Sequence, residues 1–228
     1  MNAPAIGPND LILGAALGVW VLFVLLVLTR LAYDAMVKRG VEPIRAVYYN
    51  RKIIHSLAGG LVGLLLPLFS SWPIPVAAAL ALALFTYIPH KMGRLLYWFQ
   101  TQDNLYEVSF AIMWAFVVFL SWAVLNDLVL GLLPILFMAF GDSATGVVRN
   151  ALFKRRTKHW LGNVAMAAIS IPLGYYFMGL GGALAGLIAS AVERFEYPPI
   201  DDNVLVPLTS FIFLLAWQAI YSPSHIAL

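Results

Sequence analysis

Apolar stretches long enough to cross a lipid bilayer alternate with short polar connections along the whole chain. A membrane-spanning helix needs about 20 apolar residues, fewer where its ends are anchored. Eight stretches qualify, at residues 10–31, 53–70, 73–90, 107–125, 128–146, 163–178, 180–195 and 204–221. Backbone groups in lipid must be hydrogen-bonded internally, so each stretch is expected to be helical. The pattern predicts an all-α, polytopic integral membrane protein with one domain over residues 1–228.

Two pairs of these stretches are short and are separated by tight hinges at residues 70–73 and 178–181. We expect each pair to form a helical hairpin, with a re-entrant pair as the alternative. Gly182 and Gly186 indicate close helix contact in the seventh stretch, because small residues let helix backbones approach each other.

The composition supports this interpretation. Hydrophobic residues make up 62% of the chain and charged residues only 11%, whereas a soluble domain carries about 25% charged residues. The chain has no cysteine, which excludes disulfides, thiol catalysis and cysteine-ligated metals. The first ten residues contain no Lys or Arg, so a cleavable signal is not expected.

The placement of charge predicts the orientation. All 14 Lys and Arg fall in or beside the connections that follow stretches one, three, five and seven, whereas the opposite side receives only Asp10 and Asp127. Cytoplasmic loops carry the excess of basic residues. We therefore expect both termini on the non-cytoplasmic side, in either the plasma membrane or the endoplasmic reticulum.

The first polar cluster is Arg51, Lys52 and His55, at the predicted start of the second stretch. Cations at a helix entrance add to its positive dipole end and suit a phosphate clamp. Simple anchoring at the membrane interface is the alternative.

Asp142 ends an otherwise apolar fifth stretch, next to Gly141. A charged group near membrane depth is costly and usually functional. We expect Asp142 to be a metal ligand or a carboxylate of phosphate chemistry, with a hydrogen bond to a neighbouring helix as the alternative. Gly141 and Gly146 allow a ligand or another helix to come close.

A basic segment follows, from Arg149 to Asn163. Orientation or binding to anionic lipid explains Lys154, Arg155 and Arg156. Lys158 stands instead at the entrance of the sixth stretch, where a Lys suits nucleotide phosphates. The candidate phosphate-binding residues are Arg51, Lys52, His55, Gly141, Arg149, Lys158, Gly162 and Asn163.

Acidic residues then gather where the loop would be expected to be basic. Asp201, Asp202 and Asn203 lie where the eighth stretch enters the bilayer, and Glu193 precedes them. Such hard oxygen ligands suit Mg²⁺ bridging protein carboxylates to substrate phosphates, with a solvated loop as the alternative. The candidate metal ligands are Asp142, Glu193, Asp201, Asp202 and Asn203.

These groups are the ingredients of Mg²⁺-dependent phosphoryl or nucleotidyl transfer, in which positioning and charge neutralisation supply most of the catalysis. The chain contains no P-loop and no kinase glycine-rich loop.

In order, Arg51-Lys52 with His55, Gly141-Asp142, Lys158 with Gly162, Glu193 and Asp201-Asp202-Asn203 resemble the motifs of the CTP-dependent polyprenol kinases, a family that includes dolichol kinase and phytol kinase. The resemblance covers about residues 50–210. It implies transfer of the γ-phosphate of CTP, with Mg²⁺, to the hydroxyl of a long isoprenoid alcohol at the cytoplasmic face of the bilayer. It also implies Asp142, Lys158 and Asp202 as catalytic residues.

Two other functions compete with this one. A CTP-dependent cytidylyltransferase related to CDP-diacylglycerol synthases would form a CDP-activated lipid, but the Lys-Asp pair typical of those enzymes after Gly-Asp is absent. A small-molecule transporter would place its acidic residues near the bilayer midplane rather than at one face. No nucleic-acid partner is expected.

Overall fold

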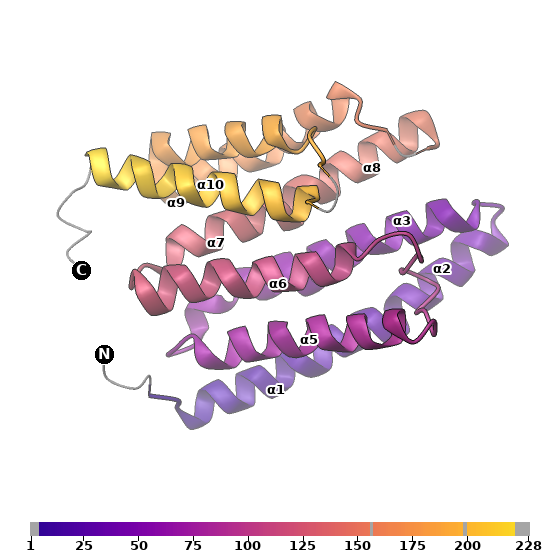
Figure 1. Ribbon diagram of the computed structural model, residues 1–228, viewed down its shortest axis with the longest axis horizontal. Coiled ribbons are helices and arrows are strands. Elements are labelled where there is room, and N and C mark those ends of the chain that lie inside the picture. The colour runs from indigo at the N-terminus through magenta and orange to yellow at the C-terminus, as the bar shows by residue number, and fades with distance from the viewer. Residues whose placement is uncertain (1–4, 156, 198–199, 222–228) are drawn as a thin grey trace.

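The computed structural model describes residues 5–155, 157–197 and 200–221, and Arg156 lies outside them. Within these residues the chain is all-helical, with seven helices long and apolar enough to cross a membrane. They are Pro8–Lys38 (α1, η1, α2), Pro43–Leu68 (α3, η2, α4, η3), Pro73–Lys91 (α5), Tyr106–Val124 (α6, η4), Leu128–Phe153 (α7, η5, α8), Trp160–Val192 (α9) and Asp202–Tyr221 (α10). The start of α1 and the end of α10 lie at the same end of the bundle (Figure 1).

The long helix α9 is itself a hairpin. Met178 and Gly179 leave helical geometry, and Gly179 has a φ of 55°, which favours glycine. The two arms pack so closely that a Cβ on Gly182 would overlap the backbone of Gly174. The predicted hinge at residues 178–181 is therefore confirmed, and the sixth and seventh predicted stretches are the two arms of α9.

The other predicted hairpin has its turn where expected, since α5 begins at Pro73. Its arms diverge, however. Helix α5 packs against α6 and also contacts α1 (Figure 1). An apolar cavity fills the space between α5 and η2 (His55–Gly60).

Three predicted boundaries differ from the structure by seven or more residues. The first stretch continues to Lys38 rather than ending at 31, the second begins at Pro43 rather than at residue 53, and the fifth continues to Phe153 rather than ending at 146. The polar residues taken to mark helix ends, Arg51, Lys52 and Asp142, are instead inside continuous helical segments and are buried.

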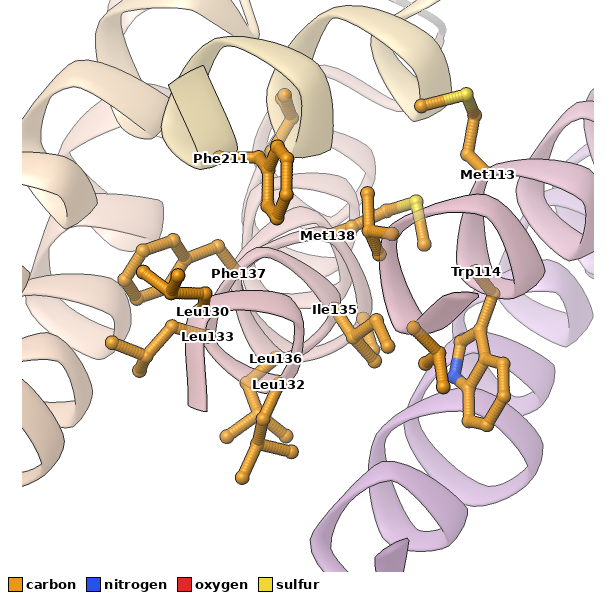
Figure 2. Close-up of a cluster of buried hydrophobic side chains, with 14 of the residues drawn as sticks. Met113, Trp114, Leu130, Leu132, Leu133, Ile135, Leu136, Phe137, Met138 and Phe211 are labelled. Carbon is orange, nitrogen blue, oxygen red and sulfur yellow. The ribbon is translucent and has the colours of Figure 1, made fainter. Parts of the chain in front are cut away.

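The centre of the bundle is the helical segment formed by α7 (Leu128–Leu136) and η5 (Phe137–Gly141). Its residues Leu130 to Ala139 are buried on every side, as expected for a helix surrounded by others (Figure 2). The segments η2 and η5 are π-helical and pack against each other. Such π turns are rare and frequently lie at functional sites. Here η2 begins at His55 and η5 leads into Asp142.

The two acids of the otherwise uncharged side have structural partners. Asp10 accepts hydrogen bonds from the backbone N–H of Gly7 and Ser70. Asp127 caps the N-terminus of α7 through Val129 N–H and accepts from Gln218. Both acids therefore tie connections together at that end of the bundle.

Candidate active site

Three carboxylates from separate helical segments converge near the charged end of the bundle. Asp142 starts α8 (Asp142–Phe153), Glu193 is the C-cap of α9, and Asp202 starts α10. One oxygen of each lies within 4.8 Å of the others. Because carboxylate oxygens are the ligands Mg²⁺ prefers, this group fits one divalent cation.

Lys52 and His55 hold Asp142. Lys52 Nζ lies 2.6 Å from Asp142 Oδ2, and His55 Nδ1 lies 3.0 Å from the same oxygen. Lys52 reaches Asp142 across Gly146, where a Cβ would overlap the lysine methylenes. Tyr48 places its ring 5.1 Å from the ammonium group. Asp142 is therefore compensated by a cation in spite of its burial.

Arg149 forms a bidentate ion pair with Glu193. Its Nη1 and Nη2 atoms lie 2.7 and 2.8 Å from the two carboxylate oxygens, with both side chains only 2% exposed. Arg149 also donates to Asn163 Oδ1 at 3.0 Å and to the His159 carbonyl at 2.9 Å. Gly162 leaves room for the guanidinium. These contacts fix Glu193 firmly at the end of the α9 hairpin.

Lys158 bridges the carboxylates of Asp202 and Glu193. Its Nζ lies 2.7 Å from Asp202 Oδ2 and 3.2 Å from Glu193 Oε1. Burial lowers the pKa of Lys158, but attraction by Asp202 and Glu193 outweighs it and raises that pKa above its ordinary value. Lys158 therefore stays protonated, just before the first turn of α9.

A cavity of about 30 Å³ lies among these side chains. Its lining includes Lys52, His55, Asp142, Lys158 and Asp202, and also Arg51, Arg149, Tyr48, Tyr106, Thr157 and Asn203. The volume suits an ion or a water molecule rather than a nucleotide. In and around this cavity, Asp142, Glu193 and Asp202 are paired with Lys52, Arg149 and Lys158, and Arg51 is paired with Glu107. The site is therefore close to neutral and would accept a cation together with an anionic ligand more readily than a bare cation.

Three predicted site residues have other close partners. Asp201 accepts hydrogen bonds from Ser109 Oγ and from Val204 N–H, and thus caps α10. Asn203 donates to the Tyr106 carbonyl at 3.2 Å. Both tie α10 to the start of α6 (Tyr106–Val118). Gly141 packs against α9, so its lack of a side chain serves helix contact.

Arg51 lies at the edge of the site. Its Nε is 2.7 Å from Glu107 Oε1, and it donates to the Phe99 carbonyl, Thr101 and Asn104. The predicted placement of Arg51, Lys52 and His55 at a helix entrance is wrong, because they lie near the middle of the segment Pro43–Leu68. Their role in binding phosphate stays a prediction. Tertiary partners, rather than a helix dipole, explain their burial.

Sequence reasoning did not place Glu107 or Tyr48 among the site residues. Glu107 is 8% exposed and occupies the first turn of α6. A carboxylate in the first turn of an apolar helix looks like an ordinary interfacial residue, and only its pairing with Arg51 reveals its position beside the site.

Comparison with protein-family models, with curated proteins and with solved structures finds no match. The resemblance to polyprenol kinases therefore depends on the ordered motifs alone.

Proposed function

We propose that this chain is a membrane lipid-alcohol kinase that transfers the γ-phosphate of CTP to an isoprenoid alcohol of the dolichol or polyprenol type. The observation that carries the proposal is the convergence of Asp142, Glu193 and Asp202 within 4.8 Å, each paired with a cation. The site would lie at the cytoplasmic membrane face, where a lipid and a soluble nucleotide can meet.

The arrangement suits phosphoryl transfer because its ion pairs can be exchanged. Bound Mg²⁺ would supply charge neutralisation on the phosphates and would be held by Asp142, Glu193 and Asp202. Lys52 and Lys158 would then turn from these carboxylates to phosphate oxygens. Arg149, buried and bidentate, would keep Glu193 in place during the exchange.

The reaction balances without a further co-reactant. The alcohol oxygen forms a bond to the γ-phosphorus, the bond from that phosphorus to the β–γ bridging oxygen breaks, and CDP leaves. The hydroxyl proton passes to a carboxylate and then to water. Asp142 is better placed than Asp202 to accept this proton. His55, which contacts Asp142, also lines the apolar cavity between α5 and η2, whereas Asp202 contacts Lys158 in the connection before α9.

Labelled CTP tests the proposal on the purified full chain in nanodiscs with Mg²⁺ and farnesol, geranylgeraniol or a long polyprenol. We expect γ-label in the lipid with CTP, and no turnover for Asp202→Asn. Label from the α-phosphate would instead identify a cytidylyltransferase. Label in neither position, with all three alcohols and with phosphatidic acid, would overturn both activities.

A further inference from the structure

An apolar cavity of about 390 Å³ lies between α1 (Pro8–Phe23), η2, α5 and α6. Each helix contributes one face to it. On α1 and η1 (Val24–Leu28) the lining residues run from Gly14 to Leu25, which is about 17 Å at 1.5 Å per residue. The cavity is therefore elongated along the helices and follows the expected direction of a lipid chain.

The polar groups of the lining are concentrated at one end. Arg51, His55 and Glu107 are its charged or titratable residues, and Arg51 is paired with Glu107. Arg51 and His55 also line the small polar cavity that contains Asp142. A molecule with its chain in the apolar cavity would thus present its head group at His55, whose Nδ1 is 3.0 Å from Asp142.

The cavity opens sideways between α1 and α5. The two helices meet at Gly14, where a Cβ would press on Ile74, whereas a Cβ on Gly18 would meet nothing within 4 Å. Leu22 and Phe85, which line the cavity, are 44% and 37% exposed. In a bilayer this seam faces the hydrocarbon region, so a lipid can enter laterally.

We propose that this cavity binds the hydrocarbon chain of the acceptor, an isoprenoid alcohol, with its hydroxyl at His55. The identity of the head group rests on the proposed function. The charges of Arg51 and Glu107 cancel at 2.7 Å, which leaves a polar end suited to an uncharged hydroxyl rather than to an anionic phospholipid head. Since a 150 Å³ cavity holds benzene, this one holds roughly 15 carbon atoms. The remainder of a longer chain extends through the seam into lipid.

Photolabelling tests the site without nucleotide or Mg²⁺. The probe is a diazirine analogue of farnesol, used on the full chain in nanodiscs. Ala78 and Ala77 are neighbours on α5 and both are exposed, but only Ala78 lines the cavity. We expect labelled peptides from η2 and α6, labelling reduced at least tenfold by Ala78→Trp, and labelling changed less than twofold by Ala77→Trp.

The outcomes separate this proposal from the kinase. Asp202→Asn should retain labelling while abolishing turnover. If the parent chain itself binds the probe but transfers no phosphate, the proposed function alone would be overturned. Equal labelling of Ala78→Trp and the parent chain would overturn the acceptor site alone. Displacement of the probe by phosphatidic acid and not by farnesol would also overturn it, by showing a phospholipid site.

Discussion

Lys52 Nζ lies 2.6 Å from Asp142 Oδ2, although 90 positions separate the two residues in the sequence. Both side chains are at most 10% exposed, and both belong to segments otherwise built to lie in lipid. This pair joins α3 (Pro43–Ile54) to α8, and both residues line the polar cavity. It explains why a charge is tolerated in each segment.

A double-mutant cycle measures that pair. Asp142→Asn or Lys52→Met alone leaves one buried charge uncompensated, so each is expected to lower the free energy of unfolding by about 3 kcal/mol. The double variant should lose less than the sum, by at least about 1 kcal/mol. Equilibrium unfolding in detergent gives all four values, and strictly additive losses would contradict the direct pairing.

Lys158 and Lys154 form a matched comparison within one basic segment. Lys158 contacts Asp202 and Glu193, whereas Lys154 is exposed at the end of α8. We expect Lys158→Gln to lower kcat/KM for CTP at least 100-fold, and Lys154→Gln to change it less than twofold. If the two variants are equally impaired, the segment contributes only its overall charge.

Asp201 provides a pH-dependent test of how α10 is anchored. Burial raises the pKa of this carboxyl to about 6. The pKa of Asp201 is higher in the folded state than in the unfolded chain, so the protonated carboxyl contributes to stability. This contribution is fully present below about pH 4 and is lost as pH rises through about 6. Asp201→Asn removes the titration but keeps a capping side chain. The variant should therefore gain stability relative to the parent chain, by about 1–2 kcal/mol, between pH 4 and 7.

Thermal unfolding of both chains at four or more pH values across this range checks the prediction. A difference in Tm that stays constant with pH would show that Asp201 does not titrate there.

The α9 hairpin gives a test independent of any activity. A Cβ on Gly182 would overlap the Gly174 backbone, which cannot move without separating the arms, so Gly182→Ala is expected to cost about 1–3 kcal/mol. Gly18→Ala is the control, because its Cβ would meet nothing within 4 Å. Its stability should be unchanged or slightly higher. Equal effects in an unfolding assay would argue against close packing of the two arms.

The sequence predicts much of the helical plan, because hydropathy and hinge chemistry are local. The hinge at residues 178–181 and the position of Lys158 beside a helix entrance follow from neighbouring residues alone. The start of the second helix does not. Arg51 and Lys52 look like interfacial residues within any short window, and their partners Glu107 and Asp142 are far along the chain.

The candidate site can likewise be predicted only in part from the sequence. Residue type and order single out Asp142, Glu193 and Asp202, which the fold brings together. Asp201 is also a carboxylate and is adjacent to Asp202, yet it turns toward Ser109 of α6. Asn203 donates to the Tyr106 carbonyl and still lines the polar cavity. Neighbouring side chains on a helix point in directions about 100° apart, so a residue next to Asp202 in the sequence need not point into the site. The apolar cavity is not predicted from sequence, since it depends on the divergence of η2 and α5.

The balance of charge in the site predicts how metal and nucleotide bind. Each carboxylate of the site already has a cationic partner: Lys52 for Asp142, Arg149 for Glu193 and Lys158 for Asp202. Mg²⁺ alone must therefore displace lysines and leave them without an anionic partner. CTP alone meets carboxylates that repel it. When both ligands bind, the carboxylates hold the metal while the lysines neutralise the phosphates.

We therefore expect Mg²⁺ to tighten CTP binding at least tenfold, and CTP to tighten Mg²⁺ binding by the same factor, since the coupling is reciprocal. Isothermal titration of the nanodisc-embedded chain, with either ligand added first, measures both factors. Asp202→Asn should reduce the coupling, and independent binding of the two ligands would show that they do not share this site.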